Sequence, residues 1–150
     1  MKVVIQRVSQ ASVFIDSNPI SNIELGYLVL LGIEAEDSMD DVVWLSKKIC
    51  NLRIFDDQEG NMNNNIVEVD GNILLVSQFT LHAKTKKGNR PSFIRAARPE
   101  FAIPLYEKMI IQLNEDLGKE IETGKFGAMM DLRLVNSGPV TIIIDSKNKD

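Results

Sequence analysis

Gly26-Tyr27-Leu28-Val29-Leu30-Leu31-Gly32-Ile33 is an uninterrupted apolar run with one glycine at its start and another near its end. A strand with one face in water alternates apolar and polar residues, so a continuous aliphatic run is typical of a strand buried on both faces. The stretch from Ile73 to Leu81 begins with the same pattern after Gly71-Asn72. The sequence therefore predicts two buried strands, around which the other elements must be arranged.

Shorter β-rich segments predict further strands at both ends of the chain. The segments are 3–8, 11–15, 128–135 and 140–144. Asn18-Pro19 is predicted to start a turn after the second of them. Gly138-Pro139 is predicted to make a turn between the last two.

Two helices follow from apolar spacing and end signals. Ser38 is a candidate N-cap with acids behind it, and apolar residues recur at helical spacing up to Asn51. A second helix is predicted from Pro99 to Gly118, with Pro104 in a first turn that tolerates proline. There is no internal repeat and no linker, so we predict one mixed α/β domain over residues 1–150 with more strand than helix.

Composition restricts the classes of protein that fit. The chain has 150 residues, a net charge of −4, one cysteine and one histidine. Cys50 alone excludes an internal disulfide and a cysteine metal cluster, which favours a reducing, cytoplasmic location and a buried helical thiol. No signal peptide is predicted, and no apolar run approaches the roughly 20 residues of a membrane helix.

Ser77-Gln78-Phe79-Thr80 places two hydroxyls and an amide at the end of the second buried strand. Buried polar groups without partners cost about 1–3 kcal/mol each, so these groups must bond to something. They could bond the local backbone as the strand ends, or face a ligand where the strand emerges. Both interpretations are open from these residues alone.

A basic stretch follows directly. Residues 84–98 contain six cations and no acid in a protein of negative net charge. A solvated loop is one interpretation, and a phosphate-binding patch is the other.

Two glycine-containing segments near the end of the chain also allow two interpretations each. Gly138-Pro139 could be a tight turn, or a rigid backbone element that touches a ligand. Gly124 to Ala128 could bend the chain into a strand, or bring backbone close to a ligand with Phe126 as a stacking face.

Taken in order, five segments resemble the D-aminoacyl-tRNA deacylase (D-tyrosyl-tRNA deacylase) family. They are 1–8, 77–81, 85–93, 123–130 and 136–141, and the resemblance extends over the whole chain. It implies a domain with barrel-like β/β/α layers, mostly antiparallel strands and two main helices. It also implies a homodimer that acts on the aminoacylated 3′ end of tRNA, with no cofactor, metal or membrane.

The resemblance implies specific roles for residues of this chain. A Gly138-cis-Pro139 motif would reach into the partner's site, read the amino group and chiral centre through main-chain carbonyls and reject L-amino acids, while Arg7 holds it. Ser137 stands where the family more usually has Asp. The residues expected at the site are Thr80 and Phe79 for catalysis, Ser77, Gln78, Phe126 and Ala102 for substrate binding, and Lys84, Lys86, Lys87 and Arg90 for tRNA phosphates.

The expected reaction is hydrolysis of the ester of D-aminoacyl-tRNA, and of glycine mischarged on tRNA. Amides near Phe79 and Thr80 would form an oxyanion hole, and Thr80 would either orient groups, with the ribose 2′-hydroxyl assisting, or act as nucleophile. Two alternatives fit the same residues. One is a Thr80-dependent esterase for small D-amino acid esters, and the other is a noncatalytic tRNA-binding module.

Overall fold

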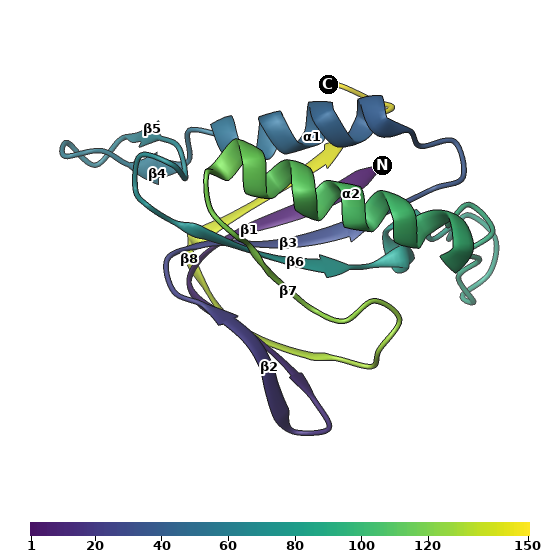
Figure 1. The fold of residues 1–150 in the computed structure, drawn as a ribbon. Helices are drawn as coiled ribbons and strands as arrows, with labels where there is room; N and C mark the ends of the chain where they lie inside the picture. The colour runs from purple at the N-terminus through teal and green to yellow at the C-terminus, as the bar shows by residue number, and fades with distance from the viewer.

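The structure is a computed structural model that describes residues 1–150. A strongly curved mixed sheet is covered on one face by two helices (Figure 1). Its strands are β1 (Lys2–Ile15), β2 (Asn18–Ile23), β3 (Gly26–Gly32), β6 (Asn72–Ser77), β7 (Glu122–Thr123) and β8 (Asp131–Asp145). The remaining elements are α1 (Met39–Asn51), the hairpin β4 (Phe55–Asp56) and β5 (Met62–Asn64), the 3-10 helix η1 (Phe79–His82) and α2 (Pro99–Leu117).

The strand order is β2-β1-β3-β6-β7, and β8 pairs with β1. β3 runs parallel to β6 and β6 parallel to β7, whereas β1 is antiparallel to β2, β3 and β8. The sheet is nearly closed into a barrel. The predicted fold class, with mostly antiparallel strands and two main helices, is confirmed.

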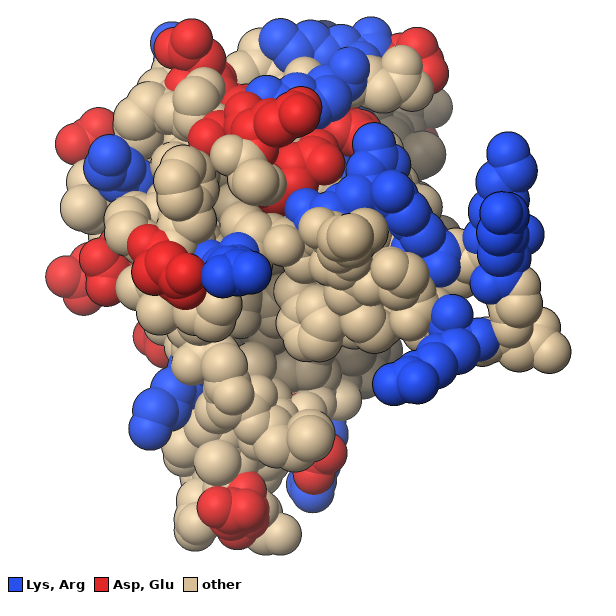
Figure 2. All heavy atoms as spheres, turned by 90° about the vertical axis from the view of Figure 1, so that its right-hand side faces the viewer, with Lys and Arg blue, Asp and Glu red and all other residues tan.

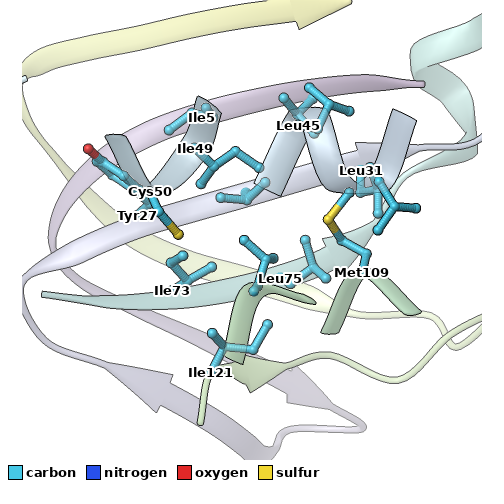
Figure 3. Close-up of a cluster of buried hydrophobic side chains, with 14 of the residues drawn as sticks. Ile5, Tyr27, Leu31, Leu45, Ile49, Cys50, Ile73, Leu75, Met109 and Ile121 are labelled. Carbon is cyan, nitrogen blue, oxygen red and sulfur yellow. The ribbon is translucent and has the colours of Figure 1, made fainter. Parts of the chain in front are cut away.

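β3 is buried on both faces, as its sequence predicts. Tyr27, Val29 and Leu31 belong to the large core between the sheet and the helices, part of which is shown in Figure 3. Leu28 belongs to a smaller core on the concave side, together with Leu74 of β6. Each core removes one row of β3 side chains from water, so the β3–β6 pair is the centre of the fold.

Three local predictions about strands are wrong. β1 is one continuous strand rather than two, because its whole length pairs with β8 across a bulge near Val8. β8 likewise runs through Gly138-Pro139, so the predicted hairpin is a bulge in one strand. The turn before β2 is made by Asp16 and Ser17, both at positive φ, and Asn18 already belongs to the strand.

The helix ends agree with the sequence more closely. Ser38 caps α1 in a capping box with Asp41, and Gly118 ends α2 at φ 80° in the left-handed region. Pro104, however, lies inside α2 beyond its first turn, five residues after Pro99. The second buried strand also ends earlier than predicted, because the chain leaves β6 at Ser77 and forms η1.

The Asp41 carboxylate links the start of α1 to the C-terminal segment. It accepts hydrogen bonds from Ser38 N at 2.8 Å, Ser146 Oγ at 2.6 Å and Lys147 Nζ at 2.8 Å. Burial raises the pKa of Asp41, but the bonds from Lys147, Ser146 and Ser38 lower it by more, so it lies well below its usual range. The ionised carboxylate therefore stabilises the folded state.

We predict that Asp41→Asn lowers the urea midpoint at pH 7. Because the folded-state pKa of Asp41 is depressed, its contribution is present above the ordinary carboxyl pKa of about 3.9 and is lost as the pH falls below it. The difference in urea midpoint between Asp41→Asn and wild type should therefore shrink as the pH is lowered from 5, as measured by urea unfolding at each pH. Asp40→Asn, an exposed neighbour, is the control. A difference for Asp41→Asn that stays constant with pH would contradict the linkage.

Candidate functional site

A cavity of about 360 Å³ opens where β3 and β6 end. Of its 14 lining residues, 11 are hydrophobic. It contains five residues expected at the site, namely Ser77, Gln78, Phe79, Ala102 and Phe126. The other lining residues are Leu31, Ile33, Val76, Ala97, Gly127, Ala128, Met129, Met130 and Leu132.

The polar end of β6 is held against β3. Ser77 pairs with Leu31, and Gln78 N donates to the Leu31 carbonyl at 2.7 Å. A Cβ on Gly32 would lie 3.1 Å from the Gln78 carbonyl oxygen and 3.0 Å from Leu81 Cβ, so glycine lets η1 lie close to β3. The end of the buried strand thus fixes where η1 begins.

The Thr80 hydroxyl is exposed and is not among the groups that line the cavity. Its Oγ1 accepts a hydrogen bond from Gln78 Nε2 at 2.5 Å. An amide cannot take up a proton, and no histidine, carboxylate or amine is hydrogen-bonded to Thr80. The N–H groups of Phe79 and Thr80, the first two residues of η1, donate to no turn or loop carbonyl.

Phe126 forms part of the cavity wall, and its ring packs against Tyr106. Its ring lies 5.5 Å from that of Tyr106, whose hydroxyl donates to the Leu75 carbonyl at 3.0 Å. Burial raises the pKa of Tyr106 to about 12, so its phenol acts as a structural donor. Sequence reasoning did not single out the adjoining Met129 and Met130 as cavity residues, since a methionine pair carries no chemical signal of its own.

Arg7 holds the Gly138-Pro139 bulge through the backbone. Its Nε donates to the Ser137 carbonyl at 3.0 Å and its Nη1 to the Ile54 carbonyl at 2.7 Å. The Gly138-Pro139 peptide is cis, and Gly138 has φ 126°, where a Cβ would lie 2.8 Å from Arg7 Nη2. Because Arg7 contacts the carbonyl of Ser137, this contact does not depend on which side chain stands there.

The bulge is not part of the cavity of its own chain. It lies opposite Arg7, which pairs with Tyr27, whereas the residue of β3 that lines the cavity is Leu31, which pairs with Val3. Four residues of strand at about 3.3 Å each separate Tyr27 from Leu31 by about 13 Å along β3. In Figure 1 the bend of β8 lies at the left, and β3 and β6 end at the right.

The basic stretch is an exposed extension next to the cavity. Lys84 and Ser92 exchange two backbone hydrogen bonds, Lys84 N to Ser92 O at 2.8 Å and Ser92 N to Lys84 O at 3.0 Å, which close a loop carrying Lys86, Lys87 and Arg90. The side chains of these cations form no ion pair. Figure 2 shows Lys and Arg gathered on and around a projecting arm, whereas Asp and Glu lie mainly elsewhere on that face.

The family model described as D-Tyr-tRNA(Tyr) deacylase matches residues 4–145. The chain belongs to this family. A D-aminoacyl-tRNA deacylase of Bacteroides fragilis is 61% identical over 150 residues, which is the full length of both proteins. The resemblance drawn from the sequence motifs is thereby confirmed.

Two solved structures share the fold of this deacylase-family chain. A structure described as c-Myc DNA unwinding element binding protein is 41% identical, with a TM-score of 0.90 over 97% of this chain and 98% of that one. A probable eukaryotic D-amino acid tRNA deacylase has a TM-score of 0.82 over 95% and 97% of the two chains at 17% identity, which supports the fold alone. Neither α1 nor α2 is both long and apolar enough to cross a membrane.

Cys50 lies on α1, away from the cavity, and is buried. Burial and the nearby charge of Asp116 raise the pKa of its thiol to about 12. We predict that iodoacetamide at pH 8 leaves the native protein unmodified and alkylates Cys50 fully in urea, as followed by mass spectrometry. A Ser92→Cys variant, with its new thiol at an exposed position, is the positive control. Rapid alkylation of native wild type at Cys50 would contradict the buried assignment.

Proposed function

We propose that this chain hydrolyses the ester that joins a D-amino acid, or glycine, to the terminal adenosine of tRNA. The observation that carries the proposal is the cavity at the end of β6, which brings Ser77, Gln78, Phe79, Ala102 and Phe126 together. The whole chain is 61% identical to a protein named D-aminoacyl-tRNA deacylase.

The cavity suits a nucleoside linked to an amino acid. Its wall is mainly hydrophobic, and Phe79 and Phe126 offer aromatic faces against which a base can stack. Ser77 and Gln78 add polar groups to this wall, with which the ribose and the ester can form hydrogen bonds. Ala102 leaves room that a larger side chain would fill.

The site supports catalysis by orientation and charge stabilisation. An aminoacyl ester is already activated, so a positioned water and a stabilised oxyanion can suffice. The unpaired amides of Phe79 and Thr80 are the donors for that oxyanion. Since the Thr80 hydroxyl is hydrogen-bonded only to the Gln78 amide, it has no base to make it a nucleophile, and it serves to orient groups together with the substrate's 2′-hydroxyl.

Chiral selection falls to the Gly138-Pro139 backbone of the partner subunit. Main-chain carbonyls can accept from the substrate's ammonium group, and a rigid backbone wall excludes a side chain of L configuration. Such a wall needs no pocket for the D side chain, so it accepts many D-amino acids. It cannot exclude glycine, which presents no side chain to clash.

Two features support action across a dimer. Within one chain the bulge lies opposite Tyr27, about 13 Å along β3 from Leu31 of the cavity wall, and it is not among the lining residues, so it is available to a second copy. β8 also pairs only with β1, and on either side of the bulge it exposes Val135 by 47% and Ile143 by 71%. A long edge strand with exposed apolar residues is normally covered in the native assembly.

The direct test compares hydrolysis of D-Tyr-tRNA, L-Tyr-tRNA, Gly-tRNA and a free D-Tyr ester. We predict release of D-tyrosine and glycine from tRNA, no release of L-tyrosine and much slower hydrolysis of the free ester. Equal rates on D-Tyr-tRNA and the free ester would favour the esterase that needs no RNA. Binding of tRNA without any turnover would favour the noncatalytic module.

Mixed dimers test whether the Gly138-Pro139 bulge of one subunit selects the substrate in the cavity of its partner. The bulge is called the gate in this test. We predict that Ala102→Phe blocks the cavity and leaves the gate intact, whereas Arg7→Ala disturbs the gate and leaves the cavity intact. Co-expression with two affinity tags yields the mixed dimer. Its one complete site should restore about half of the wild-type D-Tyr-tRNA activity, with L-Tyr-tRNA still rejected.

Each parental homodimer is the control for folding, by melting temperature, and for background activity. A mixed dimer that shows only the mean of its parents would mean that the gate acts within its own chain. A monomer in sedimentation at assay concentration would overturn the dimer itself.

A further inference from the structure

We propose that the segment from Phe93 to Phe101 is a second RNA subsite, which binds the unpaired nucleotides preceding the terminal adenosine. In this subsite the guanidinium groups of Arg95 and Arg98 hold phosphates, and the exposed side chains of Ile94 and Phe101 contact bases. The inference rests on the proposed function, because it assumes that the terminal adenosine occupies the cavity.

The segment forms one rim of the cavity and is tied to the sheet. Ala97 lines the cavity, and its N–H donates to the Ile33 carbonyl at 2.9 Å. Ala96 forms an antiparallel bridge with Glu34. The Phe93 ring meets Phe79 edge-on, with 5.1 Å between ring centres. The rim is therefore built into the fold at three points.

Large apolar side chains are exposed along this rim. Ile94 is 81% exposed and Phe101 is 54% exposed, and Phe79 at the cavity itself is 56% exposed. Apolar side chains grouped beside a cavity are typical of a binding surface rather than of a solvated loop. Aromatic faces bind single-stranded bases with little sequence preference, because every base has a π-face.

Two cations stand among these apolar side chains. Arg95 and Arg98 are exposed, their side chains form no ion pair, and they flank Ala97 of the cavity wall. Glu100 is the one acid of the segment and is exposed beside Arg98. Guanidinium groups suit this position, since their planar fork binds phosphate oxygens in pairs.

This placement divides the basic stretch into two parts. Lys86, Lys87 and Arg90 lie beyond the bridge that joins Lys84 to Ser92, in a loop that extends away from the body of the protein. Arg95 and Arg98 lie two residues before and one residue after Ala97, which lines the cavity. A strand of RNA leaving the cavity would therefore meet Arg95 and Arg98 at its first phosphates and the loop cations only farther along.

Substrates of increasing length separate the subsite from the catalytic cavity. The D-tyrosyl esters of adenosine, of the trinucleotide cytidine-cytidine-adenosine and of full tRNA are compared by kcat/KM. For wild type we expect the trinucleotide ester to be hydrolysed more efficiently than the adenosine ester. The ratio of the two efficiencies measures what the added nucleotides contribute.

We expect the ratio of kcat/KM for the trinucleotide ester to kcat/KM for the adenosine ester to fall by about fivefold or more in Phe101→Ala, because one stacked base loses its partner. We expect a similar fall in the double variant Arg95→Gln/Arg98→Gln, because the phosphates lose their partners. The double variant should also lower the slope of log Kd against log salt for the trinucleotide by about 0.7 for each phosphate that is no longer neutralised. Ile111→Ala and Lys108→Gln are the matched controls, because both are exposed positions farther along α2.

A wild-type ratio near one would overturn the subsite, and so would variants that keep the wild-type ratio. Variants that lose efficiency equally on both esters would show a structural role and would also overturn it. A wild-type protein that hydrolyses none of the three esters would instead refute the proposed function. The two failures are thus distinguishable in one set of assays.

Discussion

The central residues of β3 and β6 are buried on both faces of the sheet. Both strands are buried from the helix side and from the concave side of the sheet, and their parallel pairing holds Leu31 beside Ser77. Polar groups on such a pair would lose their hydration, so they can appear only where the pair ends. The position of the cavity follows from this constraint, since Ser77 is the first residue of β6 that reaches it with a polar side chain.

The same sheet keeps the cavity and the Gly138-Pro139 bulge apart. β1 lies between β3 and β8 and pairs with both, so Arg7 fixes the bulge at the level of Tyr27, whereas Leu31 is the residue of β3 that lines the cavity. The β1–β3 pairing runs without interruption from Lys2 to Val8, so a local movement cannot shorten that separation. In a single copy of the chain the bulge and the cavity are therefore separate features.

The sequence predicted best where a local rule decides the structure. Ser38 and Gly118 end their helices through capping, and the run from Gly26 to Ile33 is buried on both faces as its composition requires. Predictions from the sequence failed where pairing with a distant strand determines the structure. Two strands were predicted at 3–8 and 11–15, and a turn at Gly138-Pro139, because neither segment reveals that β1 and β8 pair along most of their lengths.

The candidate site shows the same division. Ser77 to Phe79 could be identified from polar groups at the end of an apolar strand, and they line the cavity. Thr80 belongs to the same motif, yet the turn into η1 directs it to solvent, where its hydroxyl meets Gln78 and no base. A hydroxyl so placed cannot supply the proton transfer that a nucleophile needs. Thr80 therefore offers no activated nucleophile, and the proposed reaction must depend on other groups of a pocket whose side chains are mostly apolar.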